Sequence, residues 1–314
     1  MRKKKEKPLI LLAICTRDAA VFEAHCAQGI AKLSSPPGFR YEVLLVENRR
    51  EASSRLGKVE TGLLTHCFLE PELGLSAVRN RVFAEAERLD AEWVACLDDD
   101  VQPVESWLEA YAEAMKSKPH GRLFHGQIWF RFPSGYSLLF ERDPDDLEQM
   151  IEKPVRFGGG NLLIHASLYR ECGLRFDPRF DACGGEDMDF RRQATLLGIK
   201  AVPVPTAVIQ ERISGHRRTL KSGFHRRLNQ GVASILMLKK YGTPLAVAVG
   251  LSIQLPRRFF KVCVTWLRVL LACLLRSKER SQTLQSAWAY TAQLMGNLLA
   301  LCGYRGSYYA RRDG

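Results

Sequence analysis

The chain contains nine cysteines but has no Cys-x-x-Cys pair and no cysteine–histidine pair at zinc-site spacing. Four of the cysteines stand in apolar runs and are expected to be small core residues: Cys15, Cys96, Cys263 and Cys273. An odd number of unpatterned thiols is typical of a reducing compartment. The cysteines therefore argue against a disulfide framework and a zinc module, and they predict a cytoplasmic protein.

Internal repeats and low-complexity segments are also lacking. The apolar run Leu9–Ile14 is too short for a signal peptide and leads directly into Thr16-Arg17-Asp18, so we expect a first strand there. No glycine-rich loop with a lysine or arginine follows this strand. Such a loop would grip a triphosphate, and its absence disfavours a nucleotidyltransferase.

Acidic residues are outnumbered, which gives a formal net charge of +12. The excess lies in the leader Arg2-Lys3-Lys4-Lys5 and in the region beyond residue 210. A basic tail suggests an anionic surface as partner, either a membrane or a nucleic acid. The aromatic residues of the tail stand within apolar stretches, so we expect a membrane and no nucleic acid.

The first part of the chain alternates strands with helices. The pattern predicts strands at 9–16, 41–48, 63–69 and 93–97, and helices at 19–33 after an Asp18 cap, after Gly74, and from near Pro103 to Met115. This alternation predicts an α/β fold with a doubly wound sheet. Further strands are expected at 121–132, 157–164 and 202–209, an acidic loop at 141–152, and a helix opened by Gly184-Gly185 and closed by Gly198.

Three carboxylates, Asp98-Asp99-Asp100, follow the buried strand at 93–97. Like charges this close raise one another's pKa unless a cation compensates, and a hard divalent cation is the simplest compensation. The carboxyl end of a strand is also where open α/β sheets bind ligands. An acidic turn before a solvated helix remains an alternative. An EF-hand loop is disfavoured, because Pro103 stands at the position where such a loop needs glycine.

Several motifs occur in a fixed order: Cys-Thr-Arg-Asp, Val-Glu-Asn, Gly-Leu-Ser-Ala-Val-Arg-Asn-Arg, Cys-Leu-Asp-Asp-Asp-Val, Gly-Gly-Asn-Leu-Leu-Ile and Gly-Gly-Glu-Asp-Met-Asp-Phe. Together they resemble the family 2 glycosyltransferases of the GT-A fold. The resemblance covers residues 8–215, after a basic leader at 1–7 and before a helical, basic region at 216–314. It implies an inverting enzyme that uses a nucleotide-diphosphate sugar and Mg²⁺ or Mn²⁺.

The resemblance also implies residue roles. Asp187 matches the catalytic base and Glu186 its neighbour in the acceptor site; the metal ligands would be Asp98 and Asp100, with His216 as a candidate third ligand that its basic surroundings disfavour. The remaining matches surround the nucleotide sugar: Thr16, Arg17, Glu47, Arg79, Asp98, Asp99 and Asn161. The family more often has aspartate at the position of Glu47.

The chemistry of glycosyl transfer accounts for these residue types. A divalent cation neutralises the leaving diphosphate, and a positioned carboxylate takes the proton of the acceptor hydroxyl. Each role has a plainer alternative: Glu186 and Asp187 as acids that suit a helix start, Gly158–Gly160 as a turn, and Arg79 as a solvated helix residue. The competing functions are a nucleotidyltransferase and a non-enzymatic basic scaffold that binds membrane or nucleic acid.

The last hundred residues are expected to be helical, beginning with 224–238. The apolar run 245–255 is too short to span a bilayer, and Pro256 interrupts it. Beyond it, Arg257, Lys261, Thr265, Arg268 and Arg276 recur at helical spacing, with Phe, Trp and Leu residues mostly on the opposite side. The four basic residues form a stripe opposite an apolar face, which predicts an in-plane membrane helix.

The uncharged stretch 284–302 is long enough to span, although its Gln, Ser and Asn residues favour a surface or packed helix. We therefore expect a peripheral protein on the inner face of the cell membrane, with a lipid-linked or cell-surface glycan as acceptor. A helical pair that covers the catalytic domain or joins a homo-oligomer is the alternative.

Overall fold

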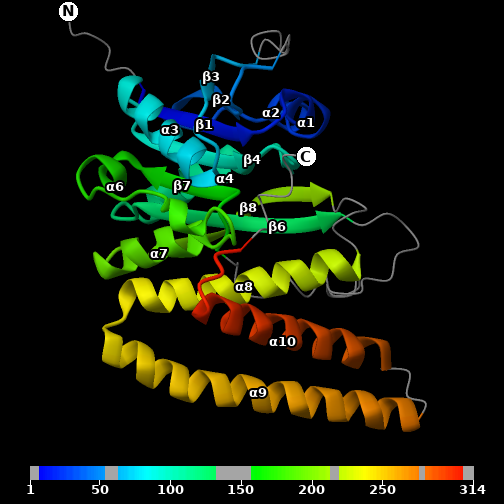
Figure 1. Ribbon diagram of the computed structural model, residues 1–314. Helices are drawn as coiled ribbons and strands as arrows, with labels where there is room; N and C mark the ends of the chain where they lie inside the picture. The colour runs from blue at the N-terminus through cyan, green and yellow to red at the C-terminus, as the bar shows by residue number, and fades with distance from the viewer. Residues whose placement is uncertain (1–6, 54–62, 132–156, 213–218, 276–279, 307–314) are drawn as a thin grey trace, which may run out of the picture. The chain divides into compact units, whose positions relative to one another are not determined.

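The computed structural model of the chain describes residues 7–53, 63–131, 157–212, 219–275 and 280–306 (Figure 1). These residues form two compact units. The first contains residues up to 131 together with 157–178 and 186–212; the second contains 179–185 and the residues from 219 onward. The predicted boundary at 215/216, most of the leader, the 141–152 loop and His216 lie outside the described residues.

The first unit is built on one eight-stranded sheet, in the order β3-β2-β1-β4-β7-β6-β8-β5. Its strands are β1 (Leu9–Thr16), β2 (Arg40–Asn48), β3 (His66–Glu70), β4 (Trp93–Asp98), β5 (Val101–Pro103), β6 (Leu123–Arg131), β7 (Asn161–His165) and β8 (Ala201–Arg212).

The sheet is mixed. Strands β3, β2, β1 and β4 are parallel to their neighbours, which confirms the doubly wound arrangement expected for the first part of the chain. Strand β7 runs antiparallel between β4 and β6, while β6 and β8 are parallel to each other. The antiparallel β7 thus inserts beside β4, at the strand that carries the three carboxylates.

One boundary prediction is wrong at Pro103. This residue does not open a helix but ends β5, which pairs antiparallel with β8 at the edge of the sheet, and the helix α4 (Trp107–Ser117) begins four residues later. Proline lacks a backbone N–H, and an edge strand tolerates this because one side of the strand needs no ladder hydrogen bond.

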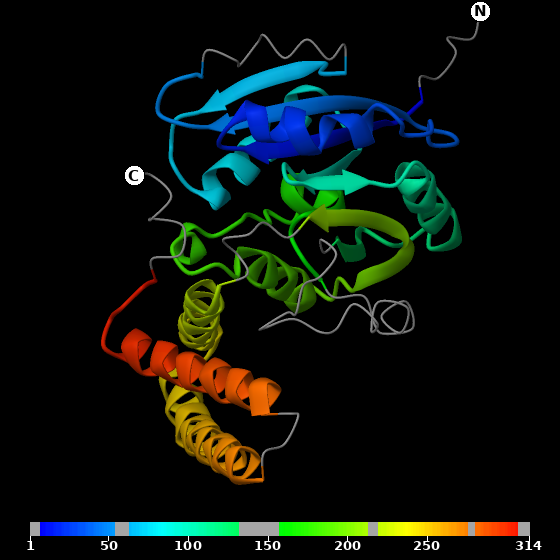
Figure 2. The ribbon, with the colours of Figure 1, turned by 90° about the vertical axis from the view of Figure 1, so that its right-hand side faces the viewer.

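Helices cover both faces of the sheet (Figure 2). They are α1 (Ala19–His25), α2 (Ala27–Ile30), α3 (Leu75–Arg88), α4, α6 (Ala166–Arg170) and α7 (Glu186–Leu196). Asp18 caps α1 as predicted, because its side chain accepts a hydrogen bond from the Ala20 N–H. The single helix expected at 19–33 is instead divided at Cys26.

Alternate residues of β1 pack into two different cores. Ile10, Leu12 and Ile14 join a cluster that includes residues of α1, α2 and α4, whereas Leu9 and Leu11 join one that includes residues of α3, α6 and α7. A strand buried on both faces needs a continuous apolar run, and that is what its sequence supplies. The polar residues at the strand ends are thereby held on a rigid base.

The second unit is dominated by α8 (Leu220–Tyr241), α9 (Pro244–Leu274) and α10 (Arg280–Leu301). Thr219 and Thr243 cap α8 and α9. Pro256, which interrupts the apolar run 245–255 in the sequence, does not end the helix but lies inside α9. Pro256 and Ser252 are both exposed, so water can satisfy the Ser252 carbonyl that proline leaves without a helical partner.

Two cysteines predicted to be core residues, Cys263 and Cys273, are exposed on α9. The described helices include no stretch long and apolar enough to cross a membrane.

Candidate active site

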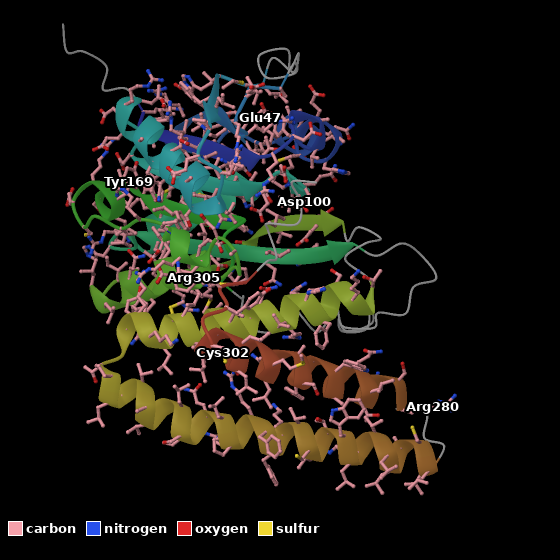
Figure 3. All side chains as sticks on the ribbon, in the orientation of Figure 1. Glu47, Asp100, Tyr169, Arg280, Cys302 and Arg305 are labelled. Carbon is pink, nitrogen blue, oxygen red and sulfur yellow. The ribbon has the colours of Figure 1, made fainter. Side chains whose placement is uncertain are left out.

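Polar residues end three neighbouring strands at one edge of the sheet. Thr16 ends β1, Glu47 stands opposite it in β2, and Asp98 ends β4 opposite Cys15. Figure 3 labels Glu47 and, beyond the end of β4, Asp100. Parallel strands bring their carboxyl ends to the same edge, where α/β proteins bind ligands. The structure therefore brings Thr16, Glu47 and Asp98 to the same edge of the sheet.

Asp99 is fixed by the end of β1. The Thr16 hydroxyl lies 2.6 Å from Asp99 Oδ2 and accepts a 3.0 Å hydrogen bond from the Asp18 N–H. Burial raises the pKa of Asp99 to about 6, against the lowering effect of the Thr16 hydrogen bond, and the charges of Asp100 and Asp98 raise it further. Arg17, between Thr16 and the helix cap, is half-buried.

We expect Asp99→Asn to stabilise the metal-free protein at pH 8. The asparagine keeps an oxygen for Thr16 but carries no charge. Because the folded pKa, about 6, exceeds the ordinary value of 3.8, the contribution of Asp99 to stability is full below pH 3.8 and is lost as the pH rises through 6. The gain should be about 1–3 kcal/mol at pH 8.

Urea unfolding in chelator at pH 8 and at pH 4 measures this difference. The gain should fall below about 1 kcal/mol at pH 4, where Asp99 is protonated in the folded protein and only partly ionised in the unfolded one. An equal gain at both pH values would mean that the Asp99 charge is not its cause.

Arg79 of α3 links two acidic groups. It donates to Glu186 Oε1 at 2.8 Å and lies 3.5 Å from Asp98 Oδ1, with its guanidinium 5.2 Å from the centre of the Phe176 ring. Burial acts to lower the pKa of Arg79, but the charges of Glu186 and Asp98 outweigh it and raise the pKa. The plainer expectation of a solvated helix arginine is wrong, because only 6% of Arg79 is exposed.

Glu186 and Asp187 begin α7 on the other side of Arg79. Burial raises the pKa of Glu186 against the opposing charge of Arg79, and Asp187 raises it further. Oxygen Oε2 of Glu186 is buried and has no hydrogen-bond partner. Asp187 is more open: Oδ2 accepts from the Gly159 N–H at 3.2 Å and Oδ1 from the Met188 N–H at 2.7 Å. The backbone thus orients the carboxylate of Asp187, while Arg79 engages that of Glu186.

The glycines before β7 allow a close approach. A Cβ atom on Gly160 would lie 2.2 Å from Asp98 Oδ2, and one on Gly159 would lie 2.6 Å from Arg79 Nη1. Any side chain here would displace these charged groups. The glycine run is therefore part of the site, beyond the turn that the sequence alone allowed.

Glu47 and Asn48 shape the β2 end of the site. Glu47 is fully buried; its Oε2 accepts from the Ser53 N–H, and its Oε1 has no hydrogen-bond partner. Asn48 was not predicted as a site residue. It donates to the Glu70 and Glu72 carbonyls and accepts from the Gly74 N–H, which fixes the loop before α3. The sequence signal that could have identified Asn48 was its position directly after Glu47, at the end of a strand.

Asn161 has a supporting place. Its Oδ1 lies 2.9 Å from Trp107 Nε1 and 2.7 Å from the Tyr111 hydroxyl, and its Nδ2 donates to the carbonyls of Gln127 and Ala207. Only 1% of its surface is exposed. Since every hydrogen-bonding group of this amide has a protein partner, Asn161 joins α4, β6, β7 and β8 beneath the carboxylates.

The acidic edge partly fits a divalent cation. Within the described ranges, no three His, Cys, Asp or Glu side chains lie close enough together to hold a metal by themselves. Asp98 and Asp100 are partly exposed, and they offer the oxygen donors that Mg²⁺ and Mn²⁺ prefer. Magnesium is commonly held by one or two carboxylates together with substrate phosphates, and this donor set suits that arrangement. His216 lies outside the described residues.

A basic hollow of about 360 Å³ lies elsewhere in the first unit. It is formed at the starts of β6 and β8 and includes Lys118, His120, Arg122 and Lys200 in its lining. No carboxylate lines it, so it offers no acidic side chain to hold a divalent cation. The carboxylate edge is the better candidate for a catalytic site.

Comparison with known proteins identifies the fold. No protein-family model and no curated protein matches the sequence. The structure resembles the mannosyltransferase PcManGT from Pyrobaculum calidifontis, solved with GDP-Man and Mn²⁺, at a TM-score of 0.59 and 16% identity over 94% of this chain and 88% of that one. GalNAc-T7, solved with UDP, GalNAc and Mn²⁺, is less similar, with a TM-score of 0.49 and 15% identity over 77% of this chain and 52% of that chain. The chain therefore has the predicted GT-A-type fold, a mixed sheet flanked by helices and followed by a helical C-terminal region.

Proposed function

We propose that the chain is a glycosyltransferase that moves a sugar from a nucleotide-diphosphate sugar to an acceptor hydroxyl. One observation carries the proposal. The carboxylates at the end of β4 and the Glu186–Asp187 pair at the start of α7 lie at one edge of the sheet, joined by Arg79. This arrangement offers a cation-binding half beside an acidic half that can take a proton.

The donor half would hold the nucleotide diphosphate. Asp98 and Asp100 would bind Mg²⁺ or Mn²⁺, which supplies positive charge to neutralise the leaving diphosphate. The unpartnered Oε1 of Glu47 is a buried acceptor that a ribose hydroxyl or a base N–H would satisfy. The related mannosyltransferase was solved with GDP-Man and Mn²⁺, which supports a donor of this class.

The acceptor half would hold the attacking hydroxyl. The acceptor oxygen forms a bond to the anomeric carbon while the bond from that carbon to the diphosphate oxygen breaks. Asp187 takes the hydroxyl proton, and a single in-line displacement inverts the anomeric configuration. Asp187 suits the base better than Glu186, because Arg79 pairs with Glu186 at 2.8 Å and would hold it in place.

The substrate assignment rests on the ordered motifs. These motifs resemble those of family 2 glycosyltransferases, and we propose that this chain uses the same inverting chemistry. We propose a lipid-linked or cell-surface glycan as the acceptor, because the tail is basic and rich in apolar residues. Arg79 would act as a positioning residue that holds Asp98 and Glu186 at a fixed separation, since it is largely buried between them.

A screen of nucleotide sugars tests this function. The full chain is incubated with each UDP-, GDP- and dTDP-sugar in Mn²⁺ and, in parallel, in excess chelator. We expect slow hydrolysis of one donor to nucleotide diphosphate and free sugar in Mn²⁺ only. Release of pyrophosphate from a nucleoside triphosphate and a sugar phosphate would instead indicate a nucleotidyltransferase. Donor hydrolysis that persists in chelator would contradict the metal assignment.

A further inference from the structure

The helical part of the second unit has an extreme charge balance. Between Thr219 and Gly306 the sequence contains thirteen lysines and arginines but one carboxylate, Glu279. The described parts of α8, α9 and α10 contain no acidic residue. Any partner that covers this surface must therefore supply negative charge, because the surface itself supplies almost none.

Helix α10 packs against both α8 and α9, which leaves the far side of α9 uncovered by described residues of this unit (Figures 1 and 2). The inward side of α9 includes the buried Thr265 and Ala272. Thr265 therefore does not share the exposed side of the basic residues, although its spacing in the sequence placed it with them. Its hydroxyl donates within the helix, to a carbonyl of the preceding turn.

The uncovered side of α9 is apolar. Its large side chains include Phe260 and Leu274, each 70% exposed, and Leu245, 75% exposed. Others on α9 are also exposed: Val249, Ile253, Phe259, Leu267, Leu270 and Leu271. A helix that is apolar on its packed side and again on its opposite side needs a second apolar environment.

Basic residues line one flank of this apolar face. Arg257, Lys261 and Arg268 are exposed and recur at spacings of four and seven, which places them along one side of the helix. Lys261 Nζ lies 4.0 Å from the centre of the Tyr290 ring, and the rings of Trp266 and Trp288 pack edge to face. Cations and amphipathic aromatic rings beside an apolar face are the groups that settle at a lipid headgroup layer.

We propose that the exposed face of α9 docks in the plane of an anionic lipid bilayer, with Phe260, Leu267 and Leu274 below the headgroups and Arg257, Lys261 and Arg268 among the phosphates. A nucleic acid would match the charge but not bury the leucines. A second copy of the chain would match the leucines but bring two basic, acid-free surfaces together. An anionic bilayer satisfies both features, and the proposal is independent of the chemistry at the carboxylate edge.

Flotation with vesicles of phosphatidylglycerol and phosphatidylcholine tests the docking surface. The full chain should float with 3:7 vesicles and much less with phosphatidylcholine alone. Lys261→Glu with Arg268→Glu should weaken binding more than about tenfold, since each basic residue near an anionic surface contributes on the order of 1 kcal/mol. Phe260→Ser with Leu267→Ser should weaken it by a similar factor, because it removes buried apolar area.

Lys32→Glu with Lys200→Glu is the matched control. It changes the net charge equally at exposed sites of the first unit, and it should float like the wild type. Circular dichroism checks that each variant is folded. Donor hydrolysis without vesicles should be unchanged in all three variants, which separates this proposal from the proposed function.

Three results would overturn the docking proposal. One is equal flotation of the wild type and the Lys261/Arg268 variant. Another is no flotation of the wild type. The third is a wild-type dimer in light scattering that the Phe260/Leu267 variant abolishes, because a second copy would then be the occupant of this face.

Discussion

Replacing Asp187 by asparagine should lower kcat by about 10²–10⁴, the usual contribution of a positioned general base. Asparagine has nearly the same shape and can still accept a hydrogen bond from the Gly159 or Met188 N–H, which hold the carboxylate in place. It cannot take the proton of the acceptor hydroxyl. Donor affinity should change little, because the hydrogen bonds of Asp187 go to the Gly159 and Met188 N–H groups and not to the carboxylates at the end of β4.

Glu186→Gln is the comparison variant for Asp187→Asn. Glutamine leaves Arg79 buried without its nearest carboxylate, so the main expected loss is in the free energy of unfolding. Steady-state kcat and donor KM, measured beside thermal unfolding, separate the two effects. If Asp187→Asn turned over at the wild-type rate, the base would have to be another group, and Glu186 would be the first to examine.

The strand ends were predictable because burial leaves a clear trace in sequence. β1, β2 and β4 are buried on both faces, so each is an apolar run that stops where polar residues begin, at Thr16, Glu47 and Asp98. Asp18 was equally readable as a helix cap. These local signals place the carboxylates at the sheet edge without knowledge of the remaining strands.

The long-range contacts of the site were not predictable in this way. Arg79 and Glu186 are 107 residues apart, and the sequence does not say that one buried pair joins them. The insertion of β7 between β4 and β6 brings Gly159 and Gly160 against Arg79 and Asp98, yet strand order depends on pairings that no local pattern encodes. Asn161 matched a motif, but only its hydrogen bonds show that it joins neighbouring elements of the sheet and α4. The partners are Trp107, Tyr111, Gln127 and Ala207.

In the second unit, the sequence indicated that α9 is amphipathic, but it did not indicate which of its faces is packed. The sequence placed Thr265 with Arg257 and Lys261, although it faces inward. Helix α9 has two apolar faces, and a helical pattern alone does not say which of them the protein covers. The packing of α10 decides this point, and it leaves the face with Phe260 and Leu274 open.

Asp100→Ala should abolish the dependence of nucleotide-diphosphate binding on Mn²⁺. Among the described residues, the cation would depend on Asp98, Asp100 and the phosphates of the nucleotide, so the loss of one carboxylate removes a large share of this donor set. Asp100 is a cleaner target than Asp98, because Asp98 lies 3.5 Å from Arg79 and its removal would also disturb that buried cation.

Calorimetric titration of GDP and UDP, with Mn²⁺ and with chelator, measures this effect. The wild type should bind one nucleotide more tightly in Mn²⁺, whereas Asp100→Ala should bind it in Mn²⁺ only as tightly as the wild type does in chelator. Glu105→Ala is the matched control, since it removes one exposed carboxylate near the same strand and should leave the Mn²⁺ effect intact. If Asp100→Ala kept the full Mn²⁺ effect, the cation would have to bind elsewhere, and the assignment of Asp100 as a metal ligand would be wrong.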